Sequence, residues 1–178
     1  MSTHKPLAAA LLFAFALAPR LAAADSPGLG KPISEADIKP WDIGILPDGT
    51  GLPPGSGTAP EGAKIFAEKC VMCHGEGGKG GISAMLIGHG PQLTDGIESL
   101  KTIDNFWGDS TTLFDYIRRA MPYNAPRSLS DNEVYALTAY ILALNKLIGE
   151  NDVMDAKTLP QVKMPNRDNF ILPYPDRI

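Results

Sequence analysis

The residues best suited to do chemistry in this sequence are Cys70, Cys73 and His74, which form a single C-x-x-C-H motif. Two thiols at this spacing lie on adjacent turns of the chain and can add to the two vinyl groups of a haem as thioethers. The histidine that follows then lies beneath the iron and offers its imidazole as an axial ligand. We therefore predict one covalently attached haem c, bound through Cys70 and Cys73, with His74 as its proximal ligand.

Other uses of a cysteine pair fit this sequence less well. A structural zinc ion takes four protein ligands, and His89 is the one histidine that could join the motif once an N-terminal leader containing His4 is removed. A thioredoxin-like C-x-x-C belongs to a β-α-β pattern, which we do not find in the sequence. A plain disulfide would leave His74 without a role. Haem attachment therefore remains the preferred interpretation of the motif.

A second axial ligand has to come from another part of the chain. The candidates are Met85, Met121, Met154, Met164 and His89. Met121 is preferred because it ends a predicted helix and is followed by Pro122, in the loop before the last helix. A thioether ligand favours ferrous iron and raises the reduction potential. Iron with two protein ligands has no open position for a substrate, which argues against a haem enzyme or a gas sensor, and we predict no catalytic residue.

Three helices are predicted to position these residues. The first spans about residues 61–73 and carries the motif, and the second spans about 111–120, with Ser110 as a plausible N-cap. The third opens at the capping box S-D-N-E of residues 130–133 and continues with apolar residues at helical spacing. Gly149 is its expected C-cap. No run alternates as a strand would, so the predicted fold class is all-α.

We predict that the helices form a haem domain at residues 61–148, flanked by two arms at residues 25–60 and 149–178. Both flanking stretches are rich in proline and cannot hold a helix or a central strand for long. They nevertheless contain apolar residues such as Trp41 and Phe170, in which fully disordered chains are depleted. The arms therefore either wrap their own domain or also contact another protein.

Residues 1–24 have the features of a secretory signal peptide, with a basic start, an apolar run at 6–19 and a small-x-small site at Ala22–Ala24. The apolar run is too short to span a bilayer, which takes about 20 residues. An uncleaved N-terminal anchor is the alternative to a cleaved signal peptide. Cleavage after Ala24 would leave 14 basic and 20 acidic residues, a formal charge of −6. This charge argues against nucleic acid as a partner. We expect an exported mature protein without a membrane span.

Several residues around the motif resemble those of class I cytochromes c. Gly62 and Phe66 precede the motif, and Leu137 and Tyr140 lie on the last predicted helix. They resemble the contact of the first and last helices in that family, where a glycine lets two backbones approach closely and an aromatic ring fills the angle. As ordinary core residues they would lie in the same place. The resemblance implies the class I cytochrome c fold, here with extended irregular N- and C-terminal arms.

The segment Gly90–Leu93 (GPQL) resembles the G-P-x-L segment of the same family. The resemblance implies that the Pro91 carbonyl accepts the ring N–H of His74 and that Leu93 packs against the haem. A metal-bound histidine generally needs such an acceptor, although the segment could also be a simple turn. Trp107 either donates its indole N–H to a haem propionate or packs as an ordinary aromatic side chain.

Three longer stretches, at residues 47–57, 111–125 and 153–169, resemble the cytochrome c subunits of sulfite dehydrogenases and of the Sox sulfane dehydrogenase. In that family the haem subunit accepts electrons from a separate molybdenum-cofactor subunit, which oxidises sulfite or protein-bound sulfane sulfur. It then passes them to a soluble cytochrome c. The resemblance implies a periplasmic electron-transfer subunit, with one haem where some sulfane dehydrogenase cytochromes carry two. A free-standing periplasmic electron carrier is the alternative.

Overall fold

The computed structural model describes residues 28–88 and 100–170, which excludes the predicted signal peptide. The chain divides into two compact units, one ending at Trp41 and one beginning at Asp42. The described part of the first unit contains one short helix, α2 (Glu35–Ile38), which begins at a capping box between Ser34 and Asp37. All of its described residues, 28–41, are exposed, so this segment builds no core of its own.

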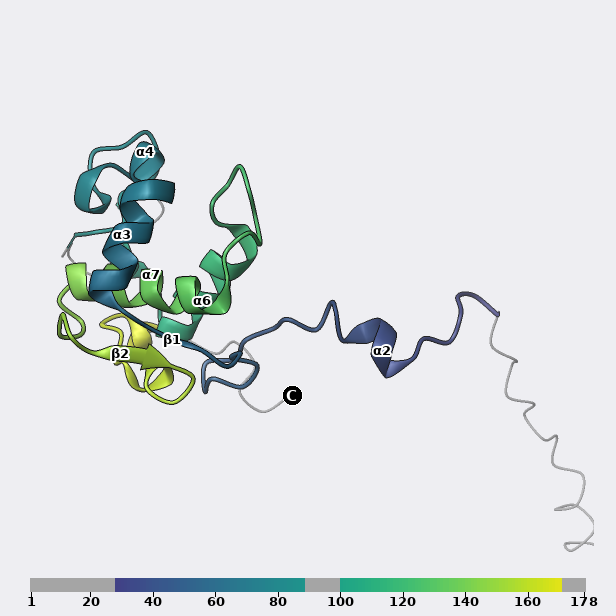
Figure 1. The fold of residues 1–178 in the computed structure, drawn as a ribbon. Helices are drawn as coiled ribbons and strands as arrows, with labels where there is room; N and C mark the ends of the chain where they lie inside the picture. The colour runs from purple at the N-terminus through teal and green to yellow at the C-terminus, as the bar shows by residue number, and fades with distance from the viewer. Residues whose placement is uncertain (1–27, 89–99, 171–178) are drawn as a thin grey trace, which may run out of the picture. The chain divides into compact units, whose positions relative to one another are not determined.

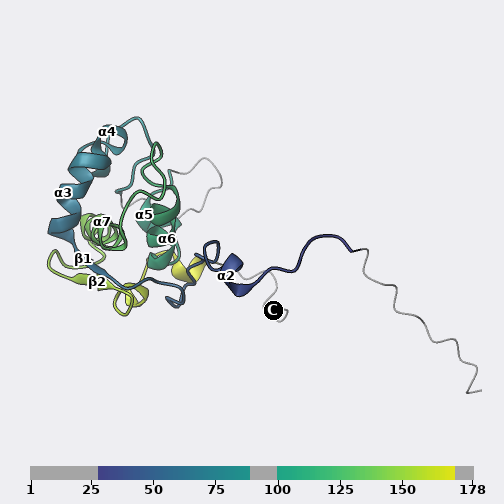
Figure 2. The same cartoon turned by 45° about the vertical axis from the view of Figure 1, so that its right-hand side comes forward.

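The second unit is built around α7 (Asp131–Leu144), which packs against α3 (Ala59–Lys69) and α6 (Ser110–Ala120). Figures 1 and 2 show α7 between these two helices. The predicted capping box at the start of α7 is confirmed, because the Glu133 carboxylate accepts the Ser130 N–H at 2.8 Å. The other helices are short: α4 (Val71–His74), α5 (Ile103–Phe106) and the 3-10 helices Glu76–Gly78, Leu159–Gln161 and Arg167–Asn169.

The crossing of α3 over α7 depends on a missing side chain. A Cβ atom at Gly62 would overlap the carbonyl of Ala136, so the two backbones could not come as close with any other residue there. One turn further along α3, the Phe66 ring lies 5.3 Å from that of Tyr140. The pairing expected from the sequence between these glycine and aromatic positions is therefore confirmed.

Three helix ends differ from the sequence prediction. Helix α6 begins at Ser110, which was predicted as its N-cap, and the N-cap residue is Asp109 instead. The predicted helix at 61–73 is two helices, α3 and α4, separated at Cys70. Helix α7 ends at Leu144 instead of continuing to Gly149, because Lys146 takes a left-handed conformation (φ 60°). A lysine gives no sequence signal for such a turn, whereas glycine does.

The structure contains two strands that were not predicted from the sequence. Strand β1 (Ser56–Thr58) pairs antiparallel with β2 (Val153–Asp155), with Gly57 opposite Met154. Each strand has three residues, which is too short for an alternating pattern to be recognised. The other regular elements of the described residues are helices, so the predicted all-α class I cytochrome c fold is confirmed.

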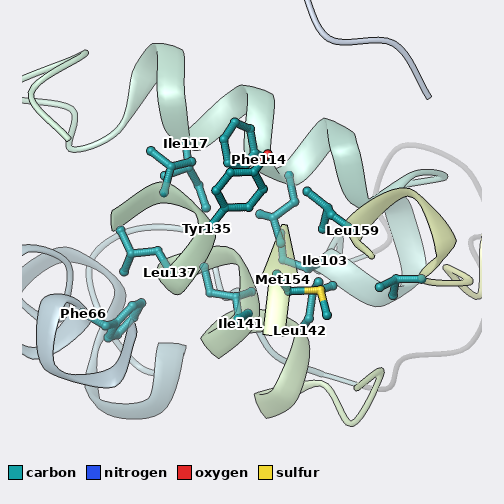
Figure 3. Packing of buried hydrophobic residues seen from close by; sticks show 14 of the residues in the cluster. Phe66, Ile103, Phe114, Ile117, Tyr135, Leu137, Ile141, Leu142, Met154 and Leu159 are labelled. Atoms are coloured by element: carbon teal, nitrogen blue, oxygen red, sulfur yellow. The ribbon is translucent and has the colours of Figure 1, made fainter. Parts of the chain in front are cut away.

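The described part of the C-terminal arm is packed onto the helical domain. Its buried residues are Met154, Leu159, Val162, Met164 and Asn166. Figure 3 shows Met154 and Leu159 among side chains of α5, α6 and α7, including Ile103, Phe114 and Leu142. This segment therefore wraps its own domain, which was one of the two alternatives left open for the arms.

Residues 42–58 also lie on this domain. The Tyr135 hydroxyl donates to the Pro53 carbonyl at 2.9 Å, and Arg119 donates to the Ile43 carbonyl at 3.1 Å. The second half of the predicted N-terminal arm is thus held by side chains of α6 and α7. No helix in residues 28–88 or 100–170 combines the length and the apolar character needed to cross a bilayer.

Candidate haem site

One turn of helix holds all three residues of the C-x-x-C-H motif. The N–H groups of Cys73 and His74 both donate to the Cys70 carbonyl, at 3.1 and 3.0 Å. Both cysteines are half-buried free thiols. The local fold therefore presents two thiols and one imidazole from a single closed turn, as the predicted attachment chemistry requires.

Burial changes the acidity of the first thiol. Removal from solvent raises the pKa of Cys70 to about 11, and the opposing effect of the positive charge of Lys69 is smaller. The free side chain is therefore neutral at pH 7 and lies in a weakly polar environment. Such an environment suits a contact with an apolar ligand.

The imidazole of His74 is oriented by a backbone carbonyl. Its Nδ1–H donates to the oxygen of Ala84 at 3.1 Å, because a carbonyl can only accept. This bond fixes the tautomer and leaves Nε2 free to bind a metal. The acceptor in the described structure is Ala84, and the role of acceptor that the sequence predicts for Pro91 is not tested by the described residues and stays a prediction. Pro91 and Leu93 both lie outside the described residues, and the contact of Leu93 with haem stays a prediction.

Ala84 begins a short segment that the fold holds by its backbone. We call residues 84–88 the proximal strap. Within it, the Leu86 N–H donates to the Gly78 carbonyl at 3.0 Å, and the Leu86 carbonyl accepts from the Ile103 N–H at 3.2 Å. The carbonyl that orients His74 is therefore two residues away from a point fixed on both sides.

The described methionines differ in how free they are to bind iron. Met154 and Met164 are 4% and 0% exposed and are part of the core under the C-terminal segment. Met85 belongs to the proximal strap, next to Ala84. Met121 is half-buried and caps the C-terminal end of α6. Of these four, Met121 is neither enclosed in the core nor part of the strap, which supports it as the second ligand. The rival His89 lies outside the described residues.

Trp107 packs against another aromatic ring. Its ring is half-buried and meets Tyr116 edge-on, with centroids 5.4 Å apart. This geometry favours the packing alternative for the ring, while the proposed bond from its indole N–H to a propionate stays a prediction.

An ion pair ties the residue before the motif to α7. Lys69 pairs with Glu133, a residue of the capping box at the start of that helix. The hydrogen bond from Lys69, followed by that from the Ser130 N–H, lowers the pKa of Glu133 to about 2. The Glu133 carboxylate therefore remains charged well into the acid range, and its pairing with Lys69 fixes the end of α3 beside the motif.

These residues fit a covalently bound haem. The donor set contains two free thiols one helical turn apart and an imidazole whose Nε2 is available. Cys70 itself and the side chains of Val71, Leu86 and Met121 pack against the core and are only half-buried. A flat apolar group could cover these surfaces.

The comparisons with known proteins agree with this geometry. Residues 59–145 match the family model described as cytochrome c. A chain in the crystal structure of the sulfane dehydrogenase SoxCD from Paracoccus pantotrophus is similar, with a TM-score of 0.73 and 37% identity over 85% of this chain and 73% of that chain. This protein belongs to the cytochrome c family, and its cofactor is covalently bound haem c.

Two curated relatives are similar over a shorter part of their length. The cbb3-type cytochrome c oxidase subunit FixP of Azorhizobium caulinodans is 34% identical over 119 residues, 65% of this chain and 37% of that protein. The thiosulfate dehydrogenase of Psychrobacter arcticus is 30% identical over 119 residues, 64% of this chain and 35% of that protein. This chain therefore spans about a third of these relatives. It is a cytochrome c electron-transfer domain related to proteins of sulfur oxidation.

Proposed function

We propose that this chain is the electron-transfer subunit of a periplasmic molybdenum dehydrogenase that oxidises sulfite or sulfane sulfur. It accepts electrons from the molybdenum-cofactor subunit, passes them to a soluble cytochrome c and carries out no catalysis itself. The observation that carries the proposal is the extent of the similarity to the SoxCD chain. That similarity covers 85% of this chain, whereas the cytochrome c model covers residues 59–145, so it includes parts of the flanking segments.

The residues of the site have distinct roles in this proposal. Cys70 and Cys73 form the thioethers, and His74 and Met121 are the axial ligands. Bound haem supplies a one-electron redox centre. The Ala84 carbonyl holds the Nδ1 proton of His74 and keeps the imidazole in one orientation. The thioether of Met121 favours the ferrous state, which suits a protein that accepts electrons.

The signal-peptide features of residues 1–24 and the relationship to Sox proteins support a periplasmic location. Intact-mass analysis of exported protein is expected to show residues 25–178 plus one haem. A mature protein that retains the apolar run at 6–19 would contradict cleavage after Ala24.

A free-standing electron carrier is the second candidate. It is favoured by the burial of Met154, Leu159 and Met164 in the chain's own core. These apolar residues are not available to a partner protein, so the irregular C-terminal segment by itself is no sign of a fixed complex.

Native purification distinguishes the two candidates. The complete chain is purified under mild conditions from its own cells, and molybdenum and haem are measured per chain. We expect molybdenum to co-purify and the haem to become reduced when sulfite or a sulfane-sulfur donor is added. A chain that purifies without molybdenum, and that neither donor reduces in the unfractionated periplasmic extract, would exclude the subunit proposal.

Paired methionine variants test the axial ligand. Met121→Ala is expected to keep covalent haem, to lose the near-infrared band of methionine bound to ferric iron, and to lower the reduction potential. Met85→Ala, on the proximal strap, is the matched control and should keep the band. If the band instead survives in Met121→Ala and disappears in Met85→Ala, the two sides of the haem have been assigned the wrong way round.

A further inference from the structure

A polar side chain is sealed inside the domain at the end of α7. Asn145 is 0% exposed and is the C-cap residue that directly follows Leu144, the last residue of α7. A buried amide left without partners would cost about 1–3 kcal/mol, so a fully enclosed asparagine at the end of an apolar helix needs specific bonds. The amide orientation follows from these bonds.

The bonds of Asn145 connect α7 with the proximal strap. Its Nδ2 donates to the Leu86 carbonyl at 3.3 Å and to the Ile141 carbonyl at 2.9 Å. Its Oδ1 lies 3.5 Å from the Gly88 N–H, which donates to it. One contact therefore stays within the helix, and the other two reach strap residues more than fifty positions earlier in the chain.

The strap is the segment that orients the proximal histidine. Its first residue, Ala84, accepts the Nδ1–H of His74. The strap is also held at Gly88, whose carbonyl accepts from the Thr102 hydroxyl at 2.9 Å. Asn145 thus bonds both Leu86 and Gly88, the two strap residues that other elements also hold.

A second buried polar residue, Thr138 on α7, makes its side-chain hydrogen bond within the helix alone. Thr138 is also 0% exposed, and its hydroxyl donates to the Val134 carbonyl within the same helix at 2.7 Å. This bond satisfies the hydroxyl without touching the strap. Burial on α7 therefore does not by itself require a bond to the strap, whereas the side chain of Asn145 makes two.

We infer that Asn145 is a positioning residue for the axial imidazole, holding the strap so that the Ala84 carbonyl stays on the Nδ1–H of His74. An acceptor at this position sets the orientation of a metal-bound imidazole and increases its basicity. A looser strap therefore means a more mobile and less basic ligand. The inference rests on the proposed ligation of the haem iron by His74.

The test compares Asn145→Leu with Thr138→Val in the complete haem-loaded protein. Leucine is similar in size to asparagine and uncharged, and it removes the side-chain bonds to the strap. We expect the Nδ1 proton of His74, followed by NMR in the ferrous protein, to exchange about tenfold faster, since about 1.4 kcal/mol of lost hydrogen bonding is a tenfold change. The reduction potential should rise, because a less basic ligand stabilises ferric iron less well.

Thr138→Val is the matched control, since it removes a buried hydrogen bond of the same helix without touching the strap. It should leave both the potential and the local exchange of the His74 proton unchanged. Equal effects in the two variants would overturn the inference. If Asn145→Leu does not fold, the wild-type protein decides, because the His74 proton and the Gly88 amide should then show similar protection, and a tenfold less protected His74 proton would contradict the inference. A wild-type chain without covalent haem would instead refute the proposed haem site.

Discussion

The two proline-rich segments that flank the helices look alike in sequence but behave differently in the structure. In the C-terminal segment, Leu159 is fully buried in the core of the domain. In the N-terminal segment, residues 28–41 are all exposed, and Trp41 has 82% of its surface accessible. Segments of similar composition thus differ in burial. The C-terminal segment contributes side chains to the core, whereas residues 28–41 leave their apolar side chains exposed to solvent.

The difference lies in what satisfies the backbone of each segment. The carbonyl of Leu159 accepts from the buried Ser110 hydroxyl at 2.6 Å, and Asn166 donates to the Phe106 carbonyl at 2.8 Å. Strand β2 adds its pairing with β1. The hydrogen bonds described for residues 28–41 instead join near neighbours, as between Ser34 and Asp37. An irregular segment can enter a core only when other elements form hydrogen bonds with its polar backbone groups. A high proline content therefore does not by itself show that a segment lies outside the folded domain.

Deletion of the C-terminal segment and deletion of residues 25–41 should differ most strongly in the yield of folded haem protein. Loss of residues 149–178 removes Met154, Leu159, Val162 and Met164 from the core, at about 1.5–3 kcal/mol each. Their sum approaches the total stability of a typical domain, about 5–15 kcal/mol. We therefore expect this deletion to abolish folded haem protein, whereas deletion of residues 25–41 from the mature chain should leave it intact. Covalent haem yield and thermal unfolding measure both.

The same difference between the two segments can be tested with one leucine from each segment. Leu159→Ala should lower the free energy of unfolding by about 2–5 kcal/mol, because it opens a cavity in a filled core. Leu29→Ala, at a residue 86% exposed, should change it by less than about 0.5 kcal/mol. Urea unfolding of the two holoproteins gives both values. Equal losses would mean that the N-terminal segment is also packed in solution.

The parts of this molecule with local signals could be predicted from sequence. The C-x-x-C-H motif gives the cofactor from residue type and spacing, and the capping box at Ser130 marks the start of α7. The helical spacing of apolar residues predicts α6 and α7 to within a few residues at most ends. Each of these features depends on residues that are close together in the chain.

Most of the missed features depend on residues that are far apart in the chain, and the early end of α7 at the left-handed Lys146 is a local exception. Pairing of β1 with β2 joins residues 56–58 to residues 153–155, and neither strand has a pattern of its own. The acceptor for His74 is a backbone carbonyl, which any residue could supply, so Ala84 carries no signal in its side chain. Asn145 did carry one, as a polar residue closing the apolar run of the last helix, but its bonds to the strap require the fold.

The exposed residues 28–41 should contribute to binding of the proposed partner protein and not to the stability of the fold. We expect Trp41→Ser to leave unfolding unchanged and to weaken the proposed complex with the molybdenum subunit by about 2 kcal/mol, roughly thirtyfold, as for an aromatic anchor. Tyr123→Ser, at another highly exposed aromatic residue just after Met121, is the comparison. Binding of the purified molybdenum subunit measures both. Weakening in Tyr123→Ser alone would place the contact at the loop that follows Met121 and not at residues 28–41.

The smallest expected difference in the free energy of unfolding concerns two aspartates, one in each segment: Asp37 is exposed and Asp155 is half-buried. Hydrogen bonds from the N–H groups of Thr158 and then Lys157 lower the pKa of Asp155, and the Ser34 N–H and hydroxyl lower that of Asp37. A carboxylate with a lowered pKa stabilises the structure above its ordinary pKa, near 3.8. That contribution is lost as the pH falls through the folded-state pKa.

The effect of each aspartate on unfolding should depend on whether its segment belongs to the core. Asp155 ends β2 and closes the turn that leads to the buried Leu159, so Asp155→Asn should destabilise the whole domain at pH 7. The deficit should shrink as the pH falls from about 4 through the lowered pKa of the folded Asp155 carboxylate, because the wild-type side chain then becomes protonated as well. Asp37→Asn should affect unfolding at neither pH, because residues 28–41 are not part of a core. Urea unfolding at pH 7 and pH 3 tests both, and a pH-independent deficit in Asp155→Asn would show that its charge is not what holds the turn.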